Sequence, residues 1–545
     1  MPLVKIDNVE LEVPAGTTVL EAAKQANIEI PHYCYHPGLK IVASCRMCLV
    51  KIEGMPKLVP SCSTRIMEAR PDRKVDGKYD MVVHYQVPEV KEAQESVLEF
   101  LLLHHPVDCP ECDQAGECFL QDYTYRYGKD HSRFEFHKRV PPRKDLGPNM
   151  LLVSTRCILC SRCVRFTDEV TGTGELVVKN RGYRSEIDMF PETSLNNKLS
   201  MCTADICPVG ALVTKDFLFK PRNWRYKKVR SVCPGCSVGC NMTIEYMEED
   251  NSIYRIKPVY NAEVNQWWMC DDGRLLYHVY KKLKRLEKPL MRRDGELKRV
   301  NWRRAYRHLF ERFQSFKPEE IAAVGSGYAT NEENFMLQKL FRDGLKCANV
   351  AIDDRFPSEE DVVYPRFIIK GEKLPNYRGA SDMLQPASTF SQLLKEIDAG
   401  KIKALYWLDG SPQFVLTEEE IQVLKKLDFL VVQHIAHTPV TEMAHIVFPG
   451  ASAYEKTGSF TNYQGRVQRI QRALLPPGAA KSDFEIFQEM LDLLDIATYL
   501  NLQEVFSEIS ETRSAYAGLS WEQMGELGAN TAVGEEAAVS SSSSS

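Results

Sequence analysis

The spacing of the cysteines constrains the fold of this chain more than any other feature of the sequence. Fifteen of its 17 cysteines, together with one histidine, fall into four sets of four, and all of these residues precede position 271. Four thiolate or imidazole ligands complete a metal site or an iron–sulfur cluster. The first half of the chain must therefore bring each set together, and the spacing predicts a series of small cluster-binding domains.

The first set has the spacing C-x10-C-x2-C-x13-C and consists of Cys34, Cys45, Cys48 and Cys62. This is a looser relative of the plant-ferredoxin run that holds a [2Fe-2S] cluster. Around it we expect a hairpin over residues 4–13, a helix opened by the capping box Thr18-x-x-Glu21 and a strand over residues 49–52. Structural zinc is the alternative, but zinc sites normally pair two Cys-x2-Cys knuckles and this set has one. The domain, residues 1–80, resembles a β-grasp ferredoxin.

The second set combines one histidine with three cysteines: His105, Cys109, Cys112 and Cys118. A cuboidal [4Fe-4S] cluster needs four ligands and no fourth thiol is near, so we count the histidine, with His104 as a neighbouring candidate. An apolar stripe over residues 90–102 predicts a helix. Pro106 is expected to end this helix close to the histidine. The run resembles the [4Fe-4S] domain shared by the large iron–sulfur subunit of respiratory complex I and iron-only hydrogenases. That resemblance implies His105 as the ligand, in a domain over residues 81–140.

The third set consists of Cys157, Cys160, Cys163 and Cys207. Its first three members open the motif C-x2-C-x2-C-x3-C-P, but Thr167 stands at the fourth position. A second run ends in Cys207-Pro208, and its other cysteine positions hold Asn197, Ser200 and Thr203. In two-cluster ferredoxins the fourth cysteine of each run ligates the other cluster, so these losses delete one cluster and leave one intact. We therefore expect a ferredoxin-like module with a single [4Fe-4S] cluster at residues 141–225, and a buried Cys202 without a ligand role.

The fourth set has the spacing C-x2-C-x3-C-x29-C and consists of Cys233, Cys236, Cys240 and Cys270. It resembles the [4Fe-4S] domain at the entrance of molybdopterin oxidoreductases. Zinc is a stronger alternative in this set, because a single Cys-x2-Cys followed by two scattered thiols is less diagnostic. We expect a third [4Fe-4S] cluster in a domain over residues 226–285.

Length and composition exclude several other classes. A chain of 545 residues predicts three or more domains, and its net charge of -5 gives no basic excess for binding nucleic acid. No stretch approaches the roughly 18 apolar residues of a transmembrane helix, and the N-terminus shows no secretory signal. We therefore expect the cysteines to lie in a reducing cytosol, with any membrane association made through partner subunits.

The second half has the pattern of an α/β domain, predicted over residues 286–500. A basic segment, Lys281 to Arg299, is expected to be a linker or solvated face between the halves. Strands alternate with helical segments, one of them opened by the capping box Thr330-x-x-Glu333, which predicts a mostly parallel sheet. The turn Gly325-x-Gly327 is a weak phosphate-binding signal and a tight turn is the simpler interpretation. The predicted strands cover residues 321–324, 404–408, 429–432 and 446–448. From residue 526 to 545 the composition predicts a disordered tail.

The order of these domains is similar to that of the G subunit, the large iron–sulfur subunit, of bacterial NADH-quinone oxidoreductase, respiratory complex I. The resemblance covers roughly residues 1 to 500 and implies a multidomain α+β and α/β protein without a catalytic centre of its own. It implies electrons arriving from an NADH/FMN-binding flavoprotein subunit, passing the first three clusters and leaving through a two-cluster ferredoxin-like subunit toward the quinone-module subunits. It also implies a peripheral position on the cytoplasmic side of the inner (plasma) membrane, with the fourth cluster away from the main route.

The second half looks like a shortened, degenerate molybdopterin oxidoreductase domain. Segments with counterparts in that family are residues 300–305, 329–334 and 455–466. Formate-oxidising relatives place a cysteine or selenocysteine at the molybdenum, whereas Phe356-Pro-Ser358 offers no thiol. Ser358 is the alternative molybdenum ligand, and Cys347 is expected to be structural. We therefore expect a scaffold without molybdopterin.

Three other functions share parts of this pattern. The large subunit of an NAD-linked formate dehydrogenase would share the four-cluster front end but bind molybdenum. An assembly scaffold would use its clusters structurally. An iron-only hydrogenase would need a late cysteine set, and only Cys347 follows Cys270. Joint analysis of iron and molybdenum tests the formate dehydrogenase, and rapid reduction of the clusters by NADH in the assembled complex would favour a relay over a scaffold.

Overall fold

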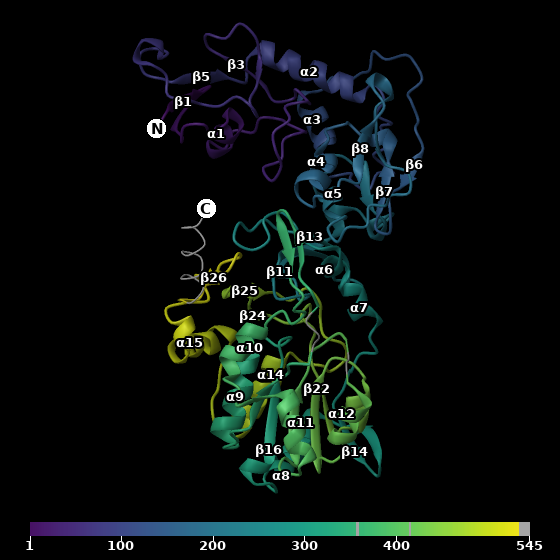
Figure 1. Ribbon diagram of the computed structural model, residues 1–545, viewed down its shortest axis with the longest axis vertical. Coiled ribbons are helices and arrows are strands. Elements are labelled where there is room, and N and C mark those ends of the chain that lie inside the picture. Colours follow the sequence, from purple (N-terminus) through teal and green to yellow (C-terminus); the bar gives the residue numbers. More distant parts are fainter. Residues whose placement is uncertain (356–358, 414–415, 533–545) are drawn as a thin grey trace. The chain divides into compact units, whose positions relative to one another are not determined.

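The computed structural model describes residues 1–355, 359–413 and 416–532. They form two compact units (Figure 1): residues 1–226 with 364–367, and the other described residues from 227 onward. The division comes before the fourth cysteine set, which shares its unit with the α/β domain. Among the described residues, no helix combines the length and apolar character needed to cross a bilayer.

The first unit begins with a five-stranded sheet in the order β2-β1-β5-β3-β4. β1 and β2 form the expected hairpin, and β5 runs parallel to β1. The helix α1 starts at the predicted capping box and buries Leu20 and Ala23 in an apolar core that also contains Cys48 and Cys62. The β-grasp fold is therefore confirmed. Its elements are β1 (Leu3–Ile6), β2 (Val9–Glu12), α1 (Val19–Gln25), β3 (Leu49–Ile52), β4 (Val59–Pro60) and β5 (Met81–His84).

The rest of the first unit consists of short elements joined by long loops that carry the second and third cysteine sets. The predicted helix before Pro106 is α2, which ends at Leu102. A three-stranded sheet has the order β10-β7-β6, and β8 and β9 form a hairpin. The bounds are α2 (Pro88–Leu102), α3 (Phe119–Tyr127), β6 (Arg143–Asp145), β7 (Met150–Val153), α4 (Arg162–Glu169), β8 (Leu176–Lys179), β9 (Glu186–Met189), α5 (Cys202–Asp205) and β10 (Leu212–Thr214).

The second unit opens with a three-stranded antiparallel sheet, in the order β11-β12-β13, followed by two short helices. The turn between β11 and β12 carries three cysteines of the fourth set, and the last one precedes α6 directly. The bounds are β11 (Lys227–Val232), β12 (Asn241–Met247), β13 (Ser252–Pro258), α6 (Asp271–Leu275) and α7 (Tyr277–Lys282).

An eight-stranded sheet, in the order β15-β14-β23-β22-β21-β16-β17-β20, forms the centre of the α/β domain. The strands from β23 to β20 run parallel, as predicted. Alternate residues of β21 face opposite apolar clusters: Tyr406 packs with α9 and α14, and Leu405 with α11 and α12. Helices thus cover both faces of this sheet (Figure 1), as parallel strands require.

The elements of this domain agree with the predicted strands and with the capping box at Thr330. The strands are β14 (Leu290–Arg293), β15 (Glu296–Arg299), β16 (Ile321–Gly325), β17 (Val350–Ile352), β18 (Val362–Tyr364), β19 (Phe367–Ile369), β20 (Ser388–Thr389), β21 (Ala404–Leu408), β22 (Phe429–His434), β23 (Ile446–Pro449), β24 (Gly458–Thr461), β25 (Arg466–Ile470) and β26 (Ala529–Asn530). The helices are α8 (Trp302–Phe313), α9 (Asn331–Lys339), α10 (Tyr377–Leu384), α11 (Phe390–Asp398), α12 (Glu418–Leu424), α13 (Pro439–Met443), α14 (Asp483–Leu493) and α15 (Leu502–Thr512).

Two expectations about boundaries need correction. The basic segment Lys281 to Arg299 is not a linker, because it contains the hairpin β14–β15, whose first strand pairs with β23 at the edge of the sheet. The domain also continues past residue 500: α15 packs into its core, and β26 pairs with β25. The predicted tail therefore does not begin at residue 526. Its remainder, residues 533–545, and Ser358 lie outside the described residues.

Candidate iron–sulfur cluster sites

The four cysteines of the first set converge on the loop that follows α1. The Cys34 thiol lies close enough to those of Cys45 and Cys62 for them to change one another's pKa, and Cys48 and Cys62 act on each other in the same way. The contact with Cys62 lowers the pKa of Cys48 to about 7. The loop is anchored to α1, because Tyr35 donates a 2.9 Å hydrogen bond to Glu21 of the capping box. None of these four cysteines is in a disulfide, so their sulfurs are available as ligands.

The second set lies between α2 and α3. Burial raises the pKa of Cys118 to about 11 and lowers the pKa of His105 to about 4, so the imidazole is in the neutral form that binds metals. The candidate His104 is exposed, and its Nδ1 accepts a 3.3 Å hydrogen bond from the Arg139 amide. The structure thus gives His104 a different partner and supports the prediction of His105.

Gly210 provides a test of whether the second site has room for a cluster. A Cβ atom at this position would lie 2.2 Å from the Cys112 sulfur, closer than any real contact. The buried Arg156, whose Nε lies 2.9 Å from Asp108 Oδ2, also borders this position. The backbone around Cys112 therefore keeps open the space beside the sulfur, and the donor set fits a cluster.

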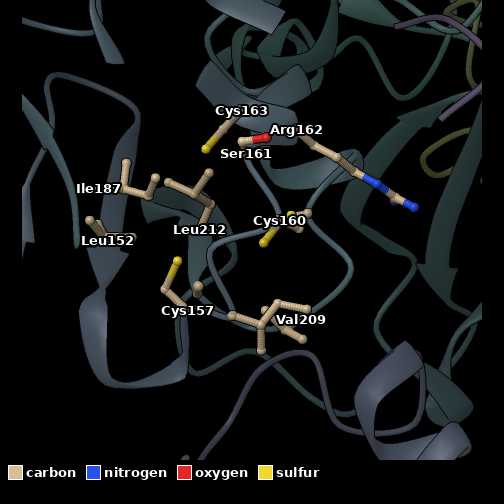
Figure 2. Close-up of a pocket in the computed structure, with 12 residues that line it drawn as sticks. Leu152, Cys157, Cys160, Ser161, Arg162, Cys163, Ile187, Val209 and Leu212 are labelled. Carbon is tan, nitrogen blue, oxygen red and sulfur yellow. The ribbon is translucent and has the colours of Figure 1, made fainter. Parts of the chain in front are cut away.

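The four cysteines of the third set line one pocket, together with apolar side chains. Figure 2 shows the sulfurs of Cys157, Cys160 and Cys163 pointing into a common space that Leu152, Ile187 and Leu212 close from the other side. Burial raises the pKa of Cys157 to about 12 and that of Cys160 to about 11. The Leu159 amide lies 3.4 Å from the Cys157 sulfur. Together, the buried thiols and the apolar walls fit a [4Fe-4S] cluster.

The position of the lost ferredoxin cluster is filled by hydrogen-bonded polar residues. Thr167, Ser200 and Thr203 are fully buried. Thr203 donates a 2.7 Å hydrogen bond to the Ser200 carbonyl, and Asn197 donates one of 2.9 Å to Glu175. Cys202 is also fully buried, as expected. The replacements thus pack as a small polar core and leave the third site complete.

The fourth set is held by the β11–β12 turn and the start of α6. The Cys233 amide donates a 2.9 Å hydrogen bond to the Cys240 carbonyl, which closes the turn. The Cys270 sulfur caps α6, because it accepts a 3.3 Å hydrogen bond from the Gly273 amide. A Cβ at Gly273 would lie 2.8 Å from the Cys233 sulfur. Glycine at this position therefore leaves room for the sulfurs of both cysteines.

Two of the positions that the sequence points to in the α/β domain, Gly325-x-Gly327 and Cys347, lie within the described residues and are occupied by contacts of the domain itself. A Cβ at Gly325 would lie 2.4 Å from Leu384, so side chains of the domain itself occupy the space that a phosphate would need. The Ser326 amide is already bonded to Asn334. The Cys347 sulfur is buried and donates a 3.0 Å hydrogen bond to the Ile321 carbonyl. Gly325-x-Gly327 is thus a tight turn, and Cys347 is structural.

Sequence spacing could not identify Gly210 or Arg156, because each lies beside the second cysteine set although it is close to the third in sequence. It also could not show that Arg162, which lies within the third set, reaches the first. Gly273 is the exception: it follows Cys270 by three residues, the distance at which an N-cap accepts a hydrogen bond.

Fold and sites together define a class: an iron–sulfur protein with several clusters, joined to an α/β domain of molybdopterin-oxidoreductase type. Family models agree with each part. They match a 2Fe-2S iron-sulfur cluster binding domain at residues 3–69, the NADH-ubiquinone oxidoreductase-G iron-sulfur binding region at 94–133, the ferredoxin-like domain of NADH-quinone oxidoreductase subunit 3 at 147–213, the molybdopterin oxidoreductase Fe4S4 domain at 226–281, and molybdopterin oxidoreductase at 285–360 and 373–493.

Curated relatives narrow this class. The G subunit of the NADH-quinone oxidoreductase of Rickettsia conorii is 29% identical over 94% of this chain and 91% of its own length. Its counterpart in Rickettsia felis is 40% identical over 62% of this chain. NADH dehydrogenase [ubiquinone] iron-sulfur protein 1 of Solanum tuberosum is 42% identical over 63% of this chain. The last two alignments cover only 48% and 45% of the relatives. Along nearly its whole length the chain is similar to a G subunit of NADH-quinone oxidoreductase, and family models of the same complex match two of its iron–sulfur regions.

A solved structure, the NAD+-reducing [NiFe]-hydrogenase in the H2-reduced state, is 30% identical over 41% of this chain and 91% of its own, with a TM-score of 0.36. A score this low does not indicate a shared overall fold.

Proposed function

We propose that this chain relays electrons that originate from NADH toward the quinone-reducing part of a respiratory complex. The [2Fe-2S] cluster would be held by the first set. The three [4Fe-4S] clusters would be held by the second set with His105, the third set and the fourth set. Such clusters exchange single electrons with little rearrangement, and the chain needs no acid, base or nucleophile for this task.

The observation that carries the proposal is the close association of the first three sets within one compact unit. The Phe119 amide, next to Cys118, donates a 3.1 Å hydrogen bond to the carbonyl of Pro208, next to Cys207. The second and third sets are therefore adjacent. A single arginine, Arg162, contacts the backbone beside both the third set and the first. These backbone contacts thus support electron transfer over short distances between neighbouring clusters.

The partners belong to the proposal as well. We place an NADH/FMN-binding flavoprotein subunit before the first three clusters and a two-cluster ferredoxin-like subunit after them, followed by quinone-module subunits. The complex would hold this chain at the cytoplasmic side of the inner (plasma) membrane. The fourth cluster lies in the second unit, and we place it outside the main route.

Metal analysis and reduction kinetics test the relay. We expect about 14 irons per chain and molybdenum far below one per chain, from one [2Fe-2S] and three [4Fe-4S] clusters. In the assembled complex, NADH should reduce the first three clusters rapidly, as followed by freeze-quench electron paramagnetic resonance (EPR), whereas the isolated chain should not react with NADH.

Each alternative predicts a different result. Stoichiometric molybdenum would support the formate dehydrogenase function. Clusters that remain oxidised when the complex turns over NADH would support the scaffold function. Zinc in place of iron in the fourth set would restrict the clusters to the first unit.

A further inference from the structure

A buried arginine without a carboxylate partner lies beside the cluster ligands. Arg162 lies on α4, directly before the ligand Cys163, and is only 4% exposed. Within the described residues, no carboxylate lies at ion-pair distance from it, and its Nε has no hydrogen-bond partner. A buried charge is costly unless something compensates it, so the compensating groups need to be identified.

The guanidinium of Arg162 contacts segments next to a ligand from each of the first three sets. Nη2 donates a 2.5 Å hydrogen bond to the carbonyl of Tyr35, which follows Cys34. Nη1 donates one of 3.0 Å to the carbonyl of Ile206, which precedes Cys207. The group also lies 5.9 Å from the ring centre of Phe119, which follows Cys118. One side chain thus sets the spacing between ligand loops that are far apart in sequence.

The orientation of Arg162 places its charge between the sites. Figure 2 shows the side chain leaving the pocket of the third set, with the guanidinium pointing away from the sulfurs of Cys157 and Cys163. Arg165, one turn along α4, extends the same contact: its Nη2 donates a 2.5 Å hydrogen bond to the Cys34 carbonyl and one of 3.4 Å to the Cys160 carbonyl. The helix therefore presents two cations between the first and third sites, and only Arg162 is fully buried.

The neighbouring groups that would compensate the charge of Arg162 are the cysteine sulfurs, which carry negative charge when they ligate a cluster. Burial lowers the pKa of Arg162 most strongly, and Arg165 lowers it further. The sulfurs of Cys160, Cys207 and Cys34 act in the opposite direction. The neighbouring His32 and His36 are histidines and therefore supply no negative charge. Lys24 is a further cation nearby, and its own partner is Glu21.

We propose that Arg162 is a positioning residue shared by the first and third clusters, which holds their ligand loops at a fixed spacing and raises the reduction potentials of both. The physical reason is that each cluster becomes more negative when it accepts an electron, and a fixed cation in a medium of low polarity stabilises that reduced form. The proposal deepens the relay described above and rests on it. A cation shared by two clusters shifts both potentials in the same direction.

The test uses the full chain in its assembled complex, with EPR-monitored redox titration and iron analysis. Arg162→Gln should lower the midpoint potentials of the first and third clusters, while the fourth cluster, in the other unit, serves as an internal control and stays unchanged. Arg162→Lys keeps the charge and should retain the wild-type potentials. Arg165→Gln, on the half-buried neighbour, should cause a smaller shift because solvent screens this charge.

The outcomes divide cleanly. Unchanged potentials in Arg162→Gln at full iron content would overturn the proposal. So would an equal shift in Arg162→Lys, or a shift in Arg165→Gln as large as that in Arg162→Gln. If Arg162→Gln fails to assemble its clusters, Arg162→Lys decides: full clusters at wild-type potentials support the role of the charge, and loss of clusters there too refutes it. A wild-type chain that is EPR-silent after dithionite would instead refute the relay itself.

Discussion

At the scale of single residues, two glycines decide whether a ligand sulfur has room. Gly210 and Gly273 belong to different units, but each lies where a Cβ would press on a cysteine sulfur. Neither has the positive φ that usually explains a glycine. Their common role is therefore to keep space beside a ligand.

Replacing Gly210 by alanine should remove the second cluster selectively. The added methyl group would overlap the Cys112 sulfur, and overpacking of this kind costs about 1–3 kcal/mol before any loss of ligation. We expect about four irons per chain to be lost, measured by iron analysis and by the EPR signal of that cluster. Gly410→Ala is the matched control, since its Cβ would make an ordinary 3.5 Å contact with Tyr328. Full iron content in Gly210→Ala would contradict the role assigned to this glycine.

The histidine ligand should raise the potential of its cluster. Replacing the neutral imidazole of His105 by a thiolate, in His105→Cys, makes the cluster more negative overall. Its midpoint potential should therefore fall in a redox titration. His104→Gln is the control and should leave both the potential and the iron content unchanged. A shift caused by the His104 variant alone would reverse the assignment of the ligand.

The candidate ligands could be proposed from sequence because groups of fixed chemistry recur in each set at characteristic spacings. The residues that would adjust the cluster potentials could not be identified in this way. Arg162 touches Tyr35 and Ile206, which are separated from it by 127 and 44 positions, and only the folded chain brings these carbonyls to one guanidinium. Spacing alone could not decide between His104 and His105, because adjacent residues fit the same pattern. Only their different contacts in the folded chain distinguish them.

At the scale of elements, the start of α9 shows a buried charge cluster that joins three parts of the α/β domain. Lys456 Nζ lies 2.7 Å from Glu333 of the α9 capping box and 2.8 Å from Asp483 of α14. All three side chains are buried. One cation cannot neutralise two buried carboxylates, so one of them must hold its proton more tightly than in water.

The stability of this domain should consequently fall as the pH rises toward neutrality. Burial raises the pKa of Glu333 to about 7, against 4.5 for an exposed glutamate. Between these values the folded state retains a proton that the unfolded state has released, so the stabilising contribution is complete below pH 4.5 and is lost toward pH 7. The slope is at most about 1.4 kcal/mol per pH unit.

Urea unfolding of the second unit between pH 5.5 and 7.5, followed by tryptophan fluorescence, would measure this slope. Glu333→Gln removes the titrating group and should flatten the dependence. Glu420→Gln is the control, because Glu420 has the same capping-box position in the exposed helix α12. Equal slopes in wild type and Glu333→Gln would contradict the prediction.

The sequence predicted helix starts correctly where nearby residues set the boundary. It missed strands that are defined by pairing with a strand far away in the sequence. The capping boxes at Thr18 and Thr330 were visible because the side chain and the N–H that it binds lie three positions apart. The hairpin β14–β15 was taken for a linker, since its charged residues lie at the edge of a sheet and the strand that it pairs with, β23, comes much later in the chain. The late strand β26 was missed because it, too, is defined by pairing with a distant strand.

At the scale of the whole molecule, the two units differ in what holds them together. The second unit has two large apolar clusters around its central sheet. In the first unit, the β-grasp domain has a smaller apolar cluster, and the elements after it are short and joined by long loops that carry the ligands. Its stability should therefore depend on metal binding far more than that of the second unit.

Removing iron with a chelator under reducing conditions should unfold the two units unequally. We expect residues 88–226 to lose most of their amide hydrogen-exchange protection, whereas the central sheet of the second unit should keep it. Hydrogen exchange with mass spectrometry measures both units in one sample. The β-grasp segment gives an internal comparison, since its core should retain intermediate protection. Equal loss in both units would contradict this difference.

The polar core at Thr167, Asn197, Ser200 and Thr203 makes the ancestral loss of a cluster hard to reverse. A cysteine at position 197 or 203 would not complete a four-thiol ligand set, and it would break a hydrogen bond that the present side chain makes. Every intermediate on the way back is thus worse than the starting point. A return from one cluster to two in this ferredoxin-like module is therefore blocked when the substitutions occur one at a time.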